Sequence, residues 1–245
     1  KELLSGNLED YAVYVQSPFP QENRLLLIGG DVSSRYTRRN VKEYEKVADY
    51  IEKMVMGKQG NYMVFFPSYQ YLKEVEEVWK GRVEEKGFCV SWISQGNRMV
   101  EEEKEQFLHL FEEDREESFV AFCVMGGIFS EGIDLKEDRL IGAAIVGTGL
   151  PMVCTEQDIL KNYFDEKQHK GFDYAYQYPG MNKVMQAAGR VIRTMEDRGV
   201  ILLLDDRFLR KEYQALFPRE WNSYQAVNRE NVAEAIRNFW ATASP

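Results

Sequence analysis

The chain has 245 residues, of which 44% are hydrophobic and 29% charged, with a formal net charge of −9. This length suits one large domain with an ample core. The sequence has no run of eighteen apolar residues and no apolar segment near its start, so we expect neither a membrane span nor a secretory signal. The acidic balance argues against a protein that coats nucleic acid, although a narrow groove with a local positive field could still hold one strand. We expect a cytoplasmic protein.

Apolar runs of strand length alternate along the chain with helical patterns. Strands are predicted at 11–16, 25–29, 62–67, 88–93, 118–125, 140–148 and 199–205. Helices are predicted near 40–56, 69–86, 98–114, 155–170, 181–194, 207–216 and 228–240. This alternation indicates βαβ units and an α/β fold, with a mainly parallel sheet covered by helices on both faces. We expect a single domain over 1–245, with a helical extension from about 218 to 245 packed on it.

The first polar cluster in chain order follows the strand at 25–29. Arg35, Arg38 and Arg39 lie there among Ser33, Ser34 and Thr37. The three arginines are candidates for binding the phosphates of a nucleic-acid strand. A loop of solvated arginines explains the same pattern equally well.

Polar residues also follow two of the predicted inner strands. The strand at 62–67 runs into Ser68 and Tyr69, and the strand at 118–125 runs into a glycine-rich loop. In α/β proteins such strand ends commonly contact ligands. The second loop supplies Ser130, Glu131, Gly132 and Asp134. A hydroxyl at a strand end can donate to a phosphate, but it is also a common turn residue.

The most informative stretch is Gln-Ala-Ala-Gly-Arg-Val-Ile-Arg at 186–193. On a helix, Gln186, Arg190 and Arg193 would share one face, and Gly189 would let another surface approach Arg190 closely. Two guanidinium groups side by side suit a phosphoryl group, because each presents a rigid fork of donors that stays charged. The alternative is an amphipathic helix with two solvated arginines.

Other polar and sulfur residues favour structural roles. His109 and His169 have mostly charged neighbours, so we interpret both as surface residues. The acidic runs are interpreted as solvated helix faces. Cys89, Cys123 and Cys154 lie more than thirty residues apart, and we interpret them as small buried residues in a reducing compartment, not as metal ligands.

Five segments in a consistent order resemble the superfamily 2 helicases, and among them the DinG/XPD group. They are Ser-Pro-Phe at 17–19, the strand and Pro-Ser-Tyr turn at 63–69, Ser-Glu-Gly-Ile-Asp at 130–134, the stretch at 186–193, and Leu-Asp-Asp-Arg-Phe at 204–208. The middle three resemble motifs IV, V and VI. The resemblance implies a RecA-like fold, and specifically the second of the two motor domains.

The resemblance also implies roles for the candidate residues. Arg190 and Arg193 correspond to arginine fingers on the γ-phosphate of ATP, and Gln186 would orient the attacking water or contact that phosphate. The expected ATP-binding residues are Glu131, Gly132, Asp134 and Gly189. The expected contacts to nucleic acid are Ser68, Tyr69, Ser130 and the arginines at 35, 38 and 39.

No Gly-x-x-x-x-Gly-Lys-[Ser/Thr] phosphate loop occurs in the sequence. By resemblance, ATP and Mg²⁺ would be shared with an N-terminal motor domain outside this chain, which would also hold any [4Fe–4S] cluster. We expect the complete enzyme to be an ATP-dependent DNA helicase that acts in DNA repair on single-stranded DNA or a forked duplex, and the chain alone to be inactive. The alternative is a RecA-like nucleic-acid-binding module whose parent has lost hydrolysis. A stand-alone phosphoryl-transfer enzyme would need a phosphate cradle, metal carboxylates and a base, and no such set is visible.

Overall fold

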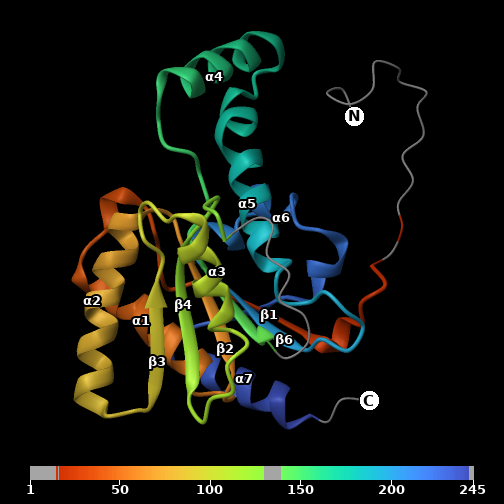
Figure 1. Ribbon diagram of the computed structural model, residues 1–245. Coiled ribbons are helices and arrows are strands. Elements are labelled where there is room, and N and C mark those ends of the chain that lie inside the picture. The colour runs from red at the N-terminus through yellow and green to blue at the C-terminus, as the bar shows by residue number, and fades with distance from the viewer. Residues whose placement is uncertain (1–14, 16, 130–138, 243–245) are drawn as a thin grey trace.

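The computed structural model describes residues 15, 17–129 and 139–242, and within them it contains one seven-stranded parallel sheet (Figure 1). The strand order is β3-β4-β2-β5-β6-β1-β7. The strands are Arg24–Gly29 (β1), Asn61–Phe66 (β2), Val90–Ser94 (β3), Ser118–Val124 (β4), Gly142–Val146 (β5), Gly199–Leu204 (β6) and Gln225–Val227 (β7). The α/β, RecA-like architecture predicted from the sequence is confirmed.

The inner strands read as continuous apolar runs because both of their faces are covered. All residues of β5 and β6 are buried, whereas β3, at one edge, is half-buried throughout. Successive side chains of a strand point to opposite faces. Accordingly, Leu25 and Leu27 of β1 enter one core, and Leu26 and Ile28 enter the other.

Three helices cover the first face. They are Val41–Val55 (α1), Tyr69–Lys86 (α2) and Val232–Ala241 (α7). The side chain of Asn40 caps α1 by accepting a hydrogen bond from the Glu43 backbone at 3.1 Å. Helix α2 ends at Gly87, whose φ of 62° lies in the left-handed region that favours glycine.

Helices Glu101–His109 (α3) and Tyr178–Ala188 (α5) cover the second face, with the short helix Lys211–Gln214 (α6) beside them. Their apolar side chains, including Phe107, Met181 and Val184, pack on the strand residues of that face. The exposed side of α3 carries the acidic run beginning at Glu101, as expected for a solvated helix face.

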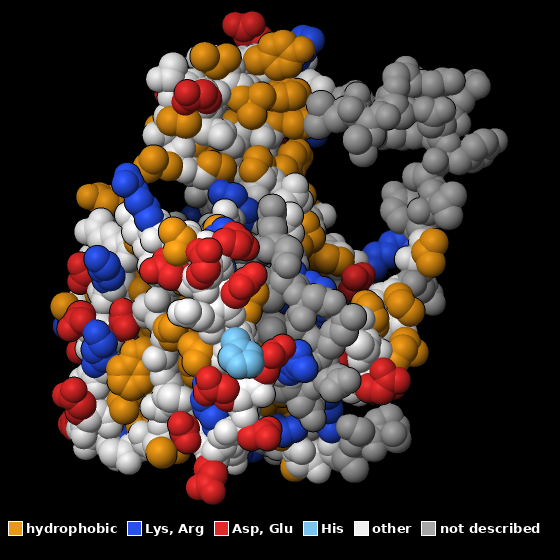
Figure 2. Space-filling view, in the orientation of Figure 1, with side chains coloured by type: hydrophobic (Ala, Val, Ile, Leu, Met, Phe, Trp, Pro, Cys, Tyr) orange, Lys and Arg blue, Asp and Glu red, His pale blue; other side chains and the backbone are white. Residues whose placement is uncertain are grey.

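Helix Thr155–Gln168 (α4) projects beyond the sheet, and a π-helical turn at Asp173–Gln177 leads from it into α5 (Figure 1). The rings of Phe164 and Tyr174 stack at 4.0 Å and join the two segments. Hydrophobic side chains gather on the surface of this projection (Figure 2), and Met152 and Val153 are 84% and 73% exposed.

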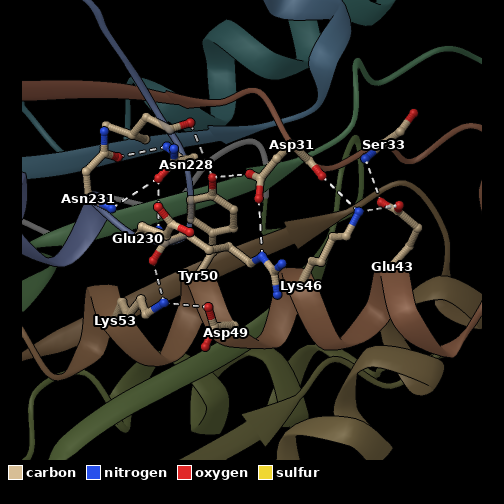
Figure 3. Close-up of polar contacts among 12 residues, drawn as sticks. Asp31, Ser33, Glu43, Lys46, Asp49, Tyr50, Lys53, Asn228, Glu230 and Asn231 are labelled. Carbon is tan, nitrogen blue, oxygen red and sulfur yellow. Dashed lines mark hydrogen bonds and ion pairs between the residues drawn. The ribbon is translucent and has the colours of Figure 1, made fainter.

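The end of the described chain packs against α1 and the sheet. Strand β7, which the sequence patterns do not predict, pairs with β1, and α7 contacts α1. Figure 3 shows polar contacts between these parts. Asp31 accepts hydrogen bonds from the Tyr50 hydroxyl and from Arg229 Nε, and Lys53 of α1 reaches the Arg229 carbonyl at 2.5 Å.

Several predicted boundaries differ from the structure. The predicted strand at 11–16 falls, except for residue 15, outside the described residues. The predicted helix at 181–194 is wrong beyond Ala188, because α5 ends there and begins earlier, at Tyr178. The predicted helix at 98–114 is shorter in the structure, where α3 spans Glu101–His109.

Candidate functional site

Two buried carboxylates hold the loop after β1. Glu43 Oε2 accepts the backbone N–H of Ser33 at 3.0 Å, and Asp205 Oδ2 accepts the backbone N–H and the hydroxyl of Ser34 at 2.8 and 2.7 Å. Burial by itself raises the pKa of the Asp205 carboxyl, but the hydrogen bonds and charge of Arg207 and the Ser34 amide outweigh it, so the pKa lies below its usual range. At Glu43, too, burial raises the pKa, but hydrogen bonds from Lys46, Ser33 and Arg38 outweigh it and the pKa is lowered. Both carboxylates are therefore charged, and they fix the path of this loop.

Two of the three predicted phosphate-binding arginines of this loop are ion-paired. Arg38 Nη2 lies 2.7 Å from Glu43 Oε1, and Arg35 Nη2 lies 3.4 Å from Asp206 Oδ1. The hydrogen bond that Arg38 donates to Glu43 raises the pKa of Arg38. Because Arg38 and Arg35 remain 45% and 33% exposed, their outer donors stay accessible to a ligand.

Arg39, the third arginine of this loop, is half-buried. Its Nε donates to the Ser34 carbonyl at 3.3 Å, and its guanidinium stands 5.5 and 5.2 Å from the ring centres of Tyr36 and Tyr71. The rings and the guanidinium border a surface pocket of about 240 Å³, which Tyr44 and Gln70 complete. Tyr36 is 84% exposed, so an accessible aromatic ring stands beside the guanidinium of Arg39.

Ser68 and Tyr69 follow β2 at the same carboxyl edge of the sheet. The Ser68 hydroxyl caps α2 by accepting a hydrogen bond from the Tyr71 backbone at 3.2 Å. The Tyr69 hydroxyl accepts a hydrogen bond from Gln95 Nε2 at 2.8 Å, and Gln95 Oε1 accepts one from the Val124 backbone at 2.9 Å. Ser68 thus has a structural role as a helix cap, whereas Tyr69 belongs to a polar network.

The residues of the stretch at 186–193 do not share one helical face, in contrast to the prediction. Gln186 lies exposed in the last turn of α5, Gly189 follows the helix, and Arg190 and Arg193 lie half-buried in the segment beyond it. After α5 the chain tightens into turns, in which the N–H groups of Arg190 and Val191 donate to the carbonyls of Ala187 and Ala188. Buried Asp197 holds the segment that follows. It accepts from the N–H groups of Arg193 and Thr194 at 2.6 and 2.7 Å.

The two groups of candidate residues lie at opposite ends of the strands. One group lies at the carboxyl ends, called the carboxyl edge here, and the other lies at the amino ends. Helix α5 starts beside the carboxyl end of β5, where a Cβ on Gly180 would lie 2.5 Å from the Thr148 carbonyl oxygen. It ends at the amino end of β6, where a Cβ on Gly199 would lie 2.3 Å from Val191 Cγ1. A six-residue strand spans about 20 Å. The arginines after α5 are therefore separated from the Ser33–Arg39 loop and Tyr69, and the two groups form two distinct surfaces.

Four candidates from the glycine-rich loop cannot be placed. Ser130, Glu131, Gly132 and Asp134 lie outside the described residues.

The predicted exposure of the histidines agrees with the structure, whereas the predicted burial of the cysteines agrees only in part. His109 and His169 are exposed, as predicted. Cys123 is buried, but Cys89 is exposed, so its predicted burial is wrong: it precedes the edge strand β3, which has a neighbour on one side only. In the described part of the chain, no group of His, Cys, Asp or Glu could hold a metal ion.

None of the described helices has the length and apolar character needed to cross a membrane.

Sequence reasoning missed four residues that hold these surfaces in place: Glu43, Gln95, Asp197 and Asp205. Asp205 lies in a segment that carried the helicase resemblance, but no role was assigned to it. Gln95 had one weak signal, since it is a polar residue two positions after the strand predicted at 88–93 and precedes a glycine. The partners of Asp205 and Gln95 are distant in sequence, 171 residues away for Asp205 and Ser34.

Comparisons with known proteins show the family to which the chain belongs. A family model described as "Helicase C-terminal domain" matches residues 51–224. The chain is 28% identical over 186 residues to the ATP-dependent DNA helicase XPD of Sulfolobus acidocaldarius, and 27% identical over 211 residues to a probable ATP-dependent helicase of Methanocaldococcus jannaschii. These alignments cover 74% and 79% of the chain but only 31% and 30% of the relatives.

A solved structure of an XPD helicase superposes with a TM-score of 0.66 at 21% identity, over 84% of this chain and 35% of the other. This likeness supports the fold. Together with the motifs and the match of the family model, it shows that the chain belongs to the helicase C-terminal domain family, with XPD-type helicases among its relatives.

Proposed function

We propose that this chain is the C-terminal motor domain of an ATP-dependent DNA helicase of the DinG/XPD type. The family membership supports the domain assignment. The two separate polar surfaces support separate contacts with ATP and with DNA. One surface, formed by Gln186, Gly189, Arg190 and Arg193, would face ATP held by an N-terminal motor domain. The other, at the carboxyl edge, would contact single-stranded DNA.

The surface at the end of α5 suits a phosphoryl group. Arg190 and Arg193 are half-buried, so their charges are less screened than those of solvated arginines. Asp197 fixes the backbone at Arg193 before any ligand binds, which lowers the cost of ordering this segment. Bound ATP with Mg²⁺ would supply the transferring phosphoryl group. Donors fixed in advance at the developing charge are the main source of catalysis in such sites.

The surface at the carboxyl edge suits a nucleic-acid backbone. Arg35, Arg38 and Arg39 lie in one loop, and their partners Asp206 and Glu43 hold two of them in defined positions. The exposed ring of Tyr36 can stack on a base, since every base presents a π-face. Opening and closing of the cleft between the two motor domains would then couple ATP hydrolysis to movement along one strand and to duplex unwinding.

The observation that carries this proposal is the match of the helicase C-terminal domain model over 51–224, with the stretch at 186–193 inside it. The test is the ATPase rate of the polypeptide that contains both motor domains, with and without single-stranded DNA. We expect stimulation by DNA, and loss of the stimulated rate in Arg190→Ala and in Arg193→Ala. A protein that binds DNA but has no ATPase activity would instead be a non-hydrolysing nucleic-acid module.

A further inference from the structure

The hydrogen-bond network around the Tyr69 hydroxyl defines on which side the hydroxyl accepts a hydrogen bond. A backbone N–H can only donate, so the oxygen of the Gln95 side chain must face Val124, as its 2.9 Å contact with Oε1 shows. The amide nitrogen of Gln95 then faces Tyr69 at 2.8 Å and donates to the phenol oxygen. The phenol oxygen is thus an acceptor in this contact, and its own proton is directed elsewhere.

Gln95 has no freedom to reverse this arrangement. It is only 5% exposed, and a Cβ placed on Gly127 would lie 3.0 Å from its Nε2 atom. Across the described ranges, Gln95 is the one hydrogen-bond partner of the Tyr69 hydroxyl. Tyr69 itself is half-buried, so part of its side chain reaches the surface, and no described residue accepts its hydroxyl proton.

The surroundings favour an anionic ligand. Tyr69 follows β2, Gln95 follows β3, and the turn containing Gly126 and Gly127 follows β4, all at the carboxyl edge. Lys183 of α5 reaches over the same turn, since a Cβ on Gly126 would lie 3.3 Å from its Nζ atom. A neutral donor and a cation therefore border two adjacent glycines. Burial raises the pKa of Tyr69, so the hydroxyl keeps its proton at neutral pH.

We propose that Gln95 is a positioning residue that turns the Tyr69 hydroxyl outward, as a donor to a backbone phosphate of single-stranded DNA. This inference rests on the function proposed above and assigns the turn after β4, with Tyr69 and Lys183, as a phosphate subsite. Gln95 does not contact the DNA. Its amide nitrogen donates to the phenol oxygen of Tyr69, and the hydroxyl proton therefore points away from Gln95.

Gln95→Glu tests the inference because it keeps the shape of the side chain and an acceptor for the Val124 amide. Its second carboxylate oxygen would accept from Tyr69, so the hydroxyl would turn inward. We expect the Kd for a fluorescein-labelled oligothymidylate, measured by anisotropy without ATP, to rise about tenfold or more, as for loss of a hydrogen bond to a charged group. Tyr69→Phe should have the same effect, and the double variant should bind no more weakly than either single variant.

A matched control and a spectroscopic readout separate this role from a structural one. Gln225→Glu adds the same charge at an exposed position of β7, at the other end of the sheet, and should leave the Kd within about twofold of wild type, since exposed charges are screened. Thermal melting checks that each variant folds. The ¹³Cζ resonance of Tyr69, assigned by its absence in Tyr69→Phe, should move in Gln95→Glu and stay in place in Gln225→Glu.

Two outcomes would contradict the proposal, and they differ in what they leave standing. If Gln95→Glu binds like wild type, or if the two single effects add in the double variant, the positioning role is wrong while the proposed function stands. If the wild-type protein does not bind the oligonucleotide, the nucleic-acid surface itself is wrong, and the subsite falls with it.

Discussion

At the scale of single residues, buried carboxylates organise the carboxyl edge. Asp205 is fully buried and makes an ion pair of 2.7 Å with Arg207 Nε, while it also holds the amide of Ser34. An unpaired charge at such a position is costly, whereas a paired and hydrogen-bonded one is tolerated. Asp205 and Gln95 join segments that are far apart in the sequence, and Glu43 of α1 holds the loop after β1, so the three set the shape of the surface proposed to bind DNA.

Replacing Asp205 with Asn should lower the free energy of unfolding by about 3–5 kcal/mol at neutral pH, because it leaves Arg207, whose side chain is only 12% exposed, without its counter-charge. The folded-state pKa of Asp205 is depressed, so its stabilising effect is present above the unfolded pKa of about 3.9 and is lost as pH falls through the folded value. Urea unfolding from pH 7 to pH 2 should show the difference between wild type and variant shrinking below about pH 4.

Asp206→Asn is the control for this measurement. Asp206 is partly exposed and its ion pair with Arg35 spans 3.4 Å, so the change should cost about 1 kcal/mol or less. A difference for Asp205→Asn that stays constant down to pH 2 would contradict a depressed pKa at this site.

At the scale of elements, helix α5 shows what sequence patterns can and cannot predict. Its apolar spacing and its place between two strands were enough to predict a helix, and six strands were located in the same way by their apolar runs. The path of the chain after α5 was not predictable, because Asp197 holds it by accepting hydrogen bonds from the amides of Arg193 and Thr194. Strand β7 was missed because it is three residues long and mostly exposed, so it has no apolar run.

Two glycines in helices give a matched test of how α5 packs against the turn after β5. A Cβ on Gly180 would meet the Thr148 carbonyl oxygen at 2.5 Å, whereas a Cβ on Gly81 of α2 would meet nothing within 4 Å. Gly180→Ala should therefore lower the free energy of unfolding by about 1–3 kcal/mol through overpacking. Gly81→Ala should raise it by about 0.5–1 kcal/mol, since alanine favours the helix. Denaturant midpoints measure both, and equal effects would show that α5 does not rest on the turn after β5.

At the scale of the whole molecule, the segment beyond the family match is part of the fold. The match ends at residue 224, yet Ile236 of α7 is fully buried and belongs to the core on the first face of the sheet. A Cβ on Gly57 would lie 2.4 Å from Ile236 Cγ2, so α7 fits closely against the end of α1.

Ile236→Ala should lower the free energy of unfolding by about 2–5 kcal/mol, because it leaves a cavity in this core. Ile159→Ala makes the same chemical change on the projecting α4, where the side chain is 66% exposed, and should change stability by about 0.5 kcal/mol or less. Equilibrium unfolding in urea compares the two variants. A small effect at Ile236 would mean that α7 adds little to the stability of the domain.

The separation of the two polar surfaces supports a motor domain that touches ATP at one edge and DNA at the other. Its most direct test is single-turnover ATP hydrolysis by the DNA-bound polypeptide with both motor domains, comparing wild type, Arg190→Ala and the exposed control Arg210→Ala. We predict that Arg190→Ala lowers the hydrolysis rate by about 10³–10⁵-fold, with nucleotide Kd nearly unchanged, and that Arg210→Ala matches wild type. A change in nucleotide Kd or KM alone, with the hydrolysis rate intact, would contradict the proposed role of Arg190.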